Sequence, residues 1–151
     1  MKIFIVNGPN LNMLGKREPE HYGSQSLDDI NKELEEEAKT LGIEVEFFQS
    51  NTEGEIINFI HGAKENGGNG IILNAGAFTH YSYAIHDAIT SVERDIPVIE
   101  VHLSNLHKRE EFRHKSVLAS ACAGQISGFG KYSYIMALQY FKMTKGGFKN
   151  C

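Results

Sequence analysis

The residue types best suited to acid–base chemistry gather between Pro97 and Arg113. The stretch begins as a short apolar run behind a proline, which predicts a buried strand over residues 97–102. Glu100 and His102 are two residues apart, so on a strand their side chains share a face. A carboxylate beside an imidazole fixes the imidazole tautomer and favours its protonated form. This pair could therefore donate a proton at neutral pH.

Beyond that strand the chain becomes polar and basic. Arg109 and Arg113 are four residues apart, so in a helical segment they would stack on one side. Two like charges at that spacing repel each other unless an anion lies between them. The same residues could equally form a strand end followed by a solvated basic turn. These residues alone do not separate an anion site from that plainer interpretation.

Length and composition describe an ordinary globular protein. The chain has 151 residues, of which 41% are hydrophobic and 23% are charged, so we expect one domain over residues 1–151. Residues 144–151 look like a loose tail. The net charge of −4 argues against a general nucleic-acid or anionic-membrane surface.

The cysteine count and the apolar runs bear on the compartment. Two cysteines, Cys122 and Cys151, cannot form a disulfide framework, which favours a reducing, cytoplasmic setting. We expect Cys122 to be a small buried residue and not a nucleophile. No run approaches the ~18 apolar residues of a membrane span, and the N-terminal run is too short for a signal peptide.

Strand and helix patterns alternate along the whole chain. The expected strands cover residues 2–7, 43–47, 71–74, 97–102 and 124–130, and the expected helices cover 27–41, 53–66, 82–93 and 131–143. Ser26 with Asp29 resembles a capping box before the first helix, and Gly42 ends it. Thr52 with Glu55 is expected to cap the second helix.

This alternation predicts an α/β fold, a flavodoxin-like three-layer sandwich. Its five-stranded parallel sheet would have the order 2-1-3-4-5, with helices on both faces. Ligands of such sheets bind beyond the carboxyl ends of the strands, near the switch point between strands 1 and 3. Asn7, Asn10, Asn74 and His102 all follow or end strands there. Their convergence favours an active site over a solvated turn.

Several familiar kinds of site do not fit. The loop after the first strand carries neither a Walker motif nor G-x-G-x-x-G, and it lacks the Ser/Thr/Gly-rich character of a flavin-phosphate loop. A phosphoacceptor domain would need acidic residues where the chain has Asn7 and Asn74. His80, His86 and His102 show no recognised ligand spacing, so we expect no metal.

A second candidate acid–base group lies in the loop over residues 8–23. Tyr22 could serve as a base only if its pKa fell from ~10 toward 7, a differential stabilisation of about 4 kcal/mol. The nearby Arg17 guanidinium could favour the phenolate. A phenolate base, an imidazolium acid, amides and arginines suit proton abstraction beside a carbonyl, followed by loss of a hydroxyl. Tyr22 could otherwise be a loop anchor that packs its ring.

At this level of detail the sequence resembles the type II 3-dehydroquinate dehydratases over about residues 3–140. The motifs that carry the resemblance are Asn7-Gly-Pro-Asn10-Leu, Leu14-Gly-x-Arg17-Glu18-Pro19-x-x-Tyr22-Gly23, Asn74-x-Gly76-Ala77-x-Thr79-His80, Asp87-Ala88 and Glu100-Val-His102-x-Ser104-Asn105-x-x-x-Arg109-Glu110-x-Phe112-Arg113. The resemblance implies reversible dehydration of 3-dehydroquinate to 3-dehydroshikimate in the shikimate pathway of aromatic biosynthesis. The reaction would pass through an enolate and need no cofactor.

The resemblance also implies residue roles. Tyr22 would be the base, and Arg17 would keep it ionised and stabilise the transition state. Arg109 would approach Tyr22 as a second positive charge. His102 would protonate the departing hydroxyl, and Glu100 would orient His102.

Other matched positions imply substrate binding. Asn10 would hold a water or the enolate oxygen. Asn74, His80 and Arg113 would bind substrate hydroxyls.

The remaining implied contacts involve backbone and a second subunit. The backbone amides of Leu103 and Ser104 would take the substrate carboxylate. Asp87 would reach the site across a subunit contact in a dodecamer built from trimers. The chain departs from the family pattern at Ala75, often a proline, and at His86, often an arginine.

One rival from another class stays open on the sequence. The chain could be a non-catalytic flavodoxin-like module that binds a small anion or a nucleotide. Either way the expected partner is a small molecule, with no nucleic acid and no membrane.

Overall fold

The computed structural model describes residues 1–16 and 24–145. Its strands are β1 (Lys2–Asn7), β2 (Glu44–Gln49), β3 (Gly70–Asn74), β4 (Val98–His102) and β5 (Gly124–Ser127). Its α-helices are α2 (Leu27–Leu41), α3 (Glu53–Gly62), α4 (Tyr83–Val92) and α5 (Tyr132–Thr144).

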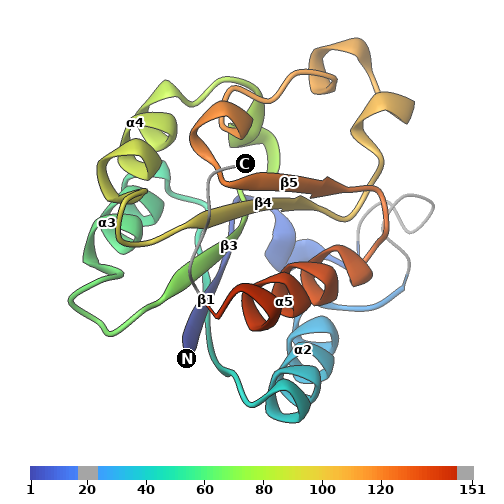
Figure 1. The fold of residues 1–151 in the computed structure, drawn as a ribbon. Helices are drawn as coiled ribbons and strands as arrows, with labels where there is room; N and C mark the ends of the chain where they lie inside the picture. The colour runs from blue at the N-terminus through green and yellow to red at the C-terminus, as the bar shows by residue number, and fades with distance from the viewer. Residues whose placement is uncertain (17–23, 146–151) are drawn as a thin grey trace.

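The strands form one parallel sheet with the order β2-β1-β3-β4-β5 (Figure 1). The predicted flavodoxin-like order is thus confirmed. The three strands β1, β3 and β4 lie in the middle, and their residues are almost all buried because helices cover both faces. β2 lies at an edge, where Glu44 and Glu46 alternate with less exposed neighbours.

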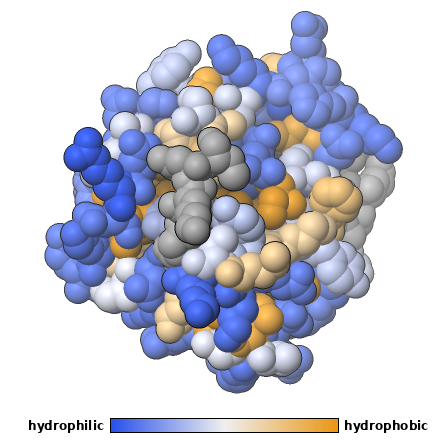
Figure 2. Space-filling view, in the orientation of Figure 1, coloured by the Kyte–Doolittle hydropathy of each residue, from blue (hydrophilic) through white to orange (hydrophobic). Residues whose placement is uncertain are grey.

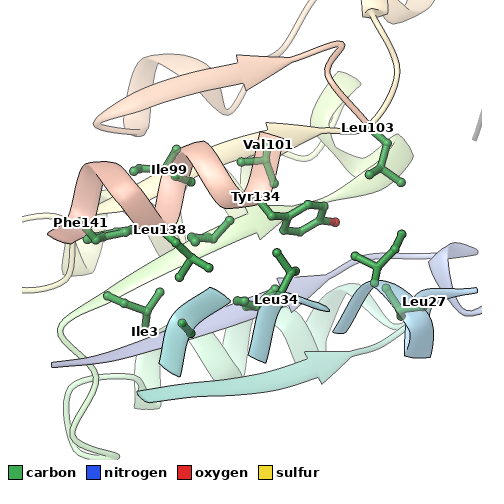
Figure 3. Close-up of a cluster of buried hydrophobic side chains, with 14 of the residues drawn as sticks. Ile3, Leu27, Leu34, Ile99, Val101, Leu103, Tyr134, Leu138 and Phe141 are labelled. Carbon is green, nitrogen blue, oxygen red and sulfur yellow. The ribbon is translucent and has the colours of Figure 1, made fainter. Parts of the chain in front are cut away.

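Two apolar clusters hold the layers together. On one face α2 and α5 pack against the sheet through side chains that include Leu34, Tyr134 and Phe141 (Figure 3). On the other face α3 and α4 bury Ile56, Ile85 and their neighbours. Each fully buried side chain of this size contributes about 1.5–3 kcal/mol to the transfer free energy. The helices on both faces therefore fix the position of the central strands.

The local signals of α2 are confirmed. The Ser26 hydroxyl accepts a hydrogen bond from the Asp29 backbone N–H, and the Asp29 carboxylate accepts one from the Ser26 N–H. Gly42 ends the helix in the left-handed region with φ 66°.

The cap predicted for α3 is wrong. Thr52 is the N-cap but its side chain makes no cap hydrogen bond, and Glu55 instead accepts a hydrogen bond from the Ser50 hydroxyl. The helix ends at Gly62 and not at residue 66, because the chain then turns so that the Gly68 N–H donates to the Ala63 carbonyl, 2.9 Å away.

The predicted fifth strand is also too long. It was expected over residues 124–130, but β5 ends at Ser127. Gly128 and Gly130 have φ values of 98° and 57°, so the backbone leaves the extended conformation there.

The surface in Figure 2 is mostly hydrophilic, with hydrophobic side chains in small patches. Within the described residues, none of the helices combines the length and apolar character needed to cross a membrane.

Candidate active site

A cavity of about 200 Å³ opens beyond the carboxyl ends of β1, β3 and β4. Its walls are Pro9, Asn10, Leu11, Met13, Leu14, Asn74, Gly76, Ala77, His80, His102, Leu103, Ser104, Leu106, Arg109 and Arg113. The crevice is therefore where the topology of the sheet predicted it.

Close backbone contact between the loops after β1 and β3 forms one wall. The Gly8 N–H donates to the Asn74 carbonyl at 2.7 Å. A Cβ at Gly8 would lie 2.5 Å from the Ala75 carbonyl oxygen, so no larger residue fits. Asn10 follows with φ 67°, a left-handed conformation that asparagine tolerates, and its N–H donates to Asn51 Oδ1 at 2.9 Å.

A buried hydrogen-bond chain holds the Asn74 amide. Asn74 Nδ2 donates to the Tyr134 hydroxyl at 2.7 Å, and that hydroxyl donates to Asn7 Oδ1 at 2.7 Å. Burial raises the pKa of Tyr134, so its hydroxyl stays protonated. Asn74 Oδ1 accepts from the Gly76 N–H at 3.2 Å, which fixes the amide orientation. Figure 3 shows the Tyr134 oxygen pointing toward the ends of the strands.

Asn7 was expected in the crevice, but it lies behind the wall. It is 1% exposed and does not line the cavity. Its packing position follows from the alternation of β1, which places Asn7 on the same face as Ile3 and Ile5, under α5. It supports Asn74 through Tyr134.

The acidic and imidazole side chains of β4 form a buried pair. His102 Nε2 donates to Glu100 Oε1 at 2.6 Å, which confirms that they share a face. Glu100 is fully buried, and its carboxylate also accepts hydrogen bonds from the Thr79 and Ser116 hydroxyls. Burial raises the pKa of Glu100, but the contacts with His102, Thr79 and Ser116 outweigh it, so the pKa lies below its usual value.

The two arginines frame the opposite wall. The segment after β4 forms two short 3-10 helices, Leu106–Lys108 and Glu111–Arg113, rather than one α-helix. Glu110 contacts both guanidinium groups, with Oε2 3.4 Å from Arg109 Nε and 3.0 Å from Arg113 Nε. The Glu110 carboxylate therefore supplies part of the negative charge that was expected between Arg109 and Arg113.

His80 also lines the cavity. Its Nδ1–H donates to the Lys115 carbonyl at 2.8 Å, and its ring meets the edge of Phe112. Burial lowers the pKa of His80 below the usual value, and the nearby positive charges of His102 and Arg113 lower it further.

The other predicted residues divide into three groups. Leu103 and Ser104 line the cavity. Asp87 does not, because its side chain lies on α4 and is 84% exposed. Arg17 and Tyr22 lie outside the described residues.

Cys122 is only partly buried and packs against the apolar cluster under α3 and α4. The burial that it does have raises the pKa of its thiol, so the group stays protonated, although the side chain is less buried than expected. Within the described ranges, no three His, Cys, Asp or Glu side chains are grouped so that they could hold a metal ion.

Three supporting residues were not singled out from the sequence. Thr79 was within a recognised motif, but it was not assigned a contact with Glu100. Ser116 lies in an irregular segment with no sequence signal. Tyr134 belongs to the apolar stripe of α5, and only its polar hydroxyl at a buried position hinted at a partner.

These contacts define what the cavity can do. A buried ionised carboxylate holds an imidazole at the wall, where it can give a proton to a bound molecule. Arg109 and Arg113 provide positive charge, and Asn10 and Asn74 provide amide groups. The site suits a small, polar, anionic molecule that undergoes proton transfer.

Comparison with known proteins gives a consistent picture. The family model described as "Dehydroquinase class II" matches residues 1–142. A 3-dehydroquinate dehydratase of Clostridium perfringens is 62% identical over 142 residues, which cover 94% of this chain and 97% of that protein. One from Caldicellulosiruptor bescii is 62% identical over 141 residues, covering 93% and 96%.

Solved structures agree in fold. A type II dehydroquinase from Butyrivibrio crossotus has a TM-score of 0.90 and 52% identity, over 93% of this chain and 96% of that one. One from Propionibacterium acnes has a TM-score of 0.89 and 39% identity, over 94% and 96%. With nearly the full length matched in family, sequence and fold, this chain belongs to the class II dehydroquinase family.

Proposed function

We propose that this chain is a 3-dehydroquinate dehydratase, a hydro-lyase that converts 3-dehydroquinate to 3-dehydroshikimate and water. The curated relatives at 62% identity carry that name. The observation that carries the proposal is the buried Glu100–His102 pair at the wall of a cavity with two arginines. A shikimate-pathway role in a cytoplasmic setting follows as part of the same proposal.

The first step removes a proton from the carbon beside the ketone. We assign this step to Tyr22 as the phenolate base, with Arg17 and Arg109 holding it ionised. The electron pair of the broken C–H bond moves to the ketone oxygen and forms an enolate. Asn10, at the cavity wall, binds that oxygen directly or through a water.

The second step expels the hydroxyl group. The enolate electrons form the new carbon–carbon double bond while the C–O bond breaks, and His102 gives its proton to the departing oxygen, so water leaves. Glu100 orients the His102 ring for this transfer. The supporting geometry is the 2.6 Å hydrogen bond from His102 to Glu100.

Binding falls to the other side chains of the wall. Asn74, His80 and Arg113 would bind substrate hydroxyls. The backbone N–H groups of Leu103 and Ser104 would bind the carboxylate. All of these residues line the cavity, which supports the assignment.

The assembly is a further part of the proposal. Asp87 projects from α4 into solvent, so within one subunit it does not reach the cavity. We infer a homo-oligomer, a dodecamer built from trimers, in which Asp87 completes a neighbouring site.

The product provides a direct test, because 3-dehydroshikimate is a conjugated enone that absorbs ultraviolet light. The substrate, 3-dehydroquinate, is not a conjugated enone. We expect absorbance to rise when 3-dehydroquinate is added to the purified protein, and we expect the same rate after treatment with a chelator. A folded protein that binds the substrate without any absorbance change would instead favour a non-catalytic binding module.

A further inference from the structure

Two loops meet at the Glu100 carboxylate. The segment Gly76–His80 brings Thr79 to it, and the segment before the 3-10 helix Ala119–Ala121 brings Ser116. The Ser116 hydroxyl lies 2.9 Å from one carboxylate oxygen and 2.8 Å from the other. Thr79 is fully buried, so its hydroxyl cannot exchange this partner for bulk water.

Two further hydrogen bonds to backbone carbonyls join the same two loops. The Val117 N–H donates to the Thr79 carbonyl at 2.8 Å, and His80 Nδ1–H donates to the Lys115 carbonyl at 2.8 Å. The residues that contact Glu100 are therefore next in sequence to residues that hold His80. A single cross-linked unit supports both the imidazole of His102 and the cavity wall.

A fully buried carboxylate needs such donors. Removal from water disfavours the ionised form strongly, and each hydrogen bond donated to the carboxylate offsets part of that cost. His102 donates only one hydrogen bond to Glu100. Without the hydroxyl donors the carboxyl would tend to take up a proton. A neutral carboxyl would then hold a protonated imidazole less firmly.

We propose that Thr79 and Ser116 are positioning residues for the proton donor: their hydroxyls keep the Glu100 carboxylate ionised and oriented, and through it set the His102 ring. The inference rests on the proposed dehydratase function. Neither residue touches the substrate in this proposal, because neither lines the cavity. Both act through Glu100.

Thr79→Val is the sharpest test, because valine keeps the shape of threonine and replaces only its hydroxyl with a methyl group. We expect kcat to fall about 10- to 100-fold, the range for loss of a hydrogen bond to a charged group, with KM nearly unchanged. Thr79→Ser keeps the hydroxyl and should restore most of kcat. Thr40→Val is the matched control and should leave kcat unchanged, since the Thr40 hydroxyl donates to the Glu36 carbonyl one turn earlier in α2, away from the cavity and from Asp87.

A double-mutant cycle distinguishes an effect through Glu100 from a loss of packing. In a Glu100→Ala background the Thr79 hydroxyl has lost its acceptor, so adding Thr79→Val should cost no further activity. Ser116 is less suitable for this test. Its hydroxyl also accepts from the Leu118 and Ala119 backbone N–H groups at 3.1 and 3.0 Å, so Ser116→Ala would disturb that turn as well.

The outcomes separate cleanly. A Thr79→Val enzyme with wild-type kcat overturns the inference, as do equal losses in Thr79→Val and Thr79→Ser or fully additive losses in the Glu100→Ala background. In each of those cases the wild-type enzyme still turns over 3-dehydroquinate and the proposed function stands. A wild-type protein that does not convert 3-dehydroquinate removes the proposed function and this inference with it.

Discussion

His102 is the residue on which the proposed chemistry depends most directly. Without its proton the hydroxyl would have to leave as hydroxide, which is a far poorer leaving group. We expect His102→Ala to lower kcat by about 10²- to 10⁴-fold, the usual contribution of a general acid. Substrate binding should remain measurable by calorimetry, because Asn74 and Arg113 are untouched.

The control for that variant is another histidine of the same segment. His107 is exposed and does not line the cavity, so His107→Ala should leave the rate unchanged. A His102→Ala enzyme that keeps a rate within a few-fold of wild type would remove His102 from the role of acid.

His80 offers a pH prediction at the same scale. Burial disfavours its charged form, so its pKa lies below the usual value of 6.5. At pH 7 the ring is then neutral, with the proton on Nδ1 for the Lys115 carbonyl and the lone pair on Nε2. Two-bond ¹H–¹⁵N spectra across a pH titration should show this tautomer and a midpoint below 6.5. A midpoint above 6.5 would contradict it.

At the scale of elements, the turn after β1 fixes how closely two strand ends approach. Gly8→Ala would place a methyl group 2.5 Å from the Ala75 backbone oxygen, which can yield only if the loops separate. We expect a loss of about 1–3 kcal/mol in the free energy of unfolding, as for other overpacked sites. Activity should fall too, because Asn10 and Asn74 would move apart. Urea unfolding and kcat/KM measure the two effects.

Gly54→Ala is the matched control for this substitution. Gly54 lies in the first turn of α3 with nothing within 4 Å of an added Cβ. Alanine there should raise the free energy of unfolding by about 0.4–1 kcal/mol, because it restricts the unfolded chain. If Gly8→Ala were as stable as Gly54→Ala, the close approach of the two loops would not constrain the site.

Elements were predictable from the sequence wherever one local rule acts alone. The capping box at Ser26 and the left-handed Gly42 fixed both ends of α2. The error at α3 arose where a second nearby hydrogen bond competes with the predicted cap. Glu55 accepts a hydrogen bond from Ser50 and so does not form a capping box with Thr52. The sequence pattern does not show which of these two contacts will form.

The site divides in the same way. Glu100 and His102 are two apart on one strand, so the period of a strand brings them together. Thr79 and Ser116 reach the same carboxylate from two loops that are separated by 37 residues, and only the folded chain joins them. Sequence patterns therefore predicted the pairing of Glu100 with His102 but not the two hydroxyls behind it.

At the scale of the whole molecule, one side of α4 exposes a large aromatic side chain and a carboxylate to solvent. Tyr83 and Asp87 are four residues apart, so they share a side of the helix, and Tyr83 is 66% exposed. Tyr81 and Phe112 are also large exposed aromatics, at 59% and 63%. An exposed aromatic side chain beside an exposed carboxylate, here Tyr83 and Asp87, is typical of a surface that meets another protein.

A charge reversal on that face tests the proposed assembly. Asp87→Arg should shift the protein to smaller species in gel filtration and lower kcat/KM, because an arginine would replace the carboxylate expected to reach the neighbouring site. Glu36→Arg is the control, since Glu36 is an exposed carboxylate on α2, on the other face of the sheet. An Asp87→Arg monomer with full activity would contradict a shared site.

Mixing two impaired variants tests directly whether two subunits share each active site. Asp87→Ala lacks the carboxylate and His102→Ala lacks the acid, so each homo-oligomer should be impaired at every site. If Asp87 completes a neighbour's cavity, dissociating and reassembling an equal mixture creates some sites that have His102 from one subunit and Asp87 from another. Random pairing would make about a quarter of the sites complete, because the contact is heterologous. No recovered activity in verified hybrid oligomers would mean that each cavity works with the residues of its own chain.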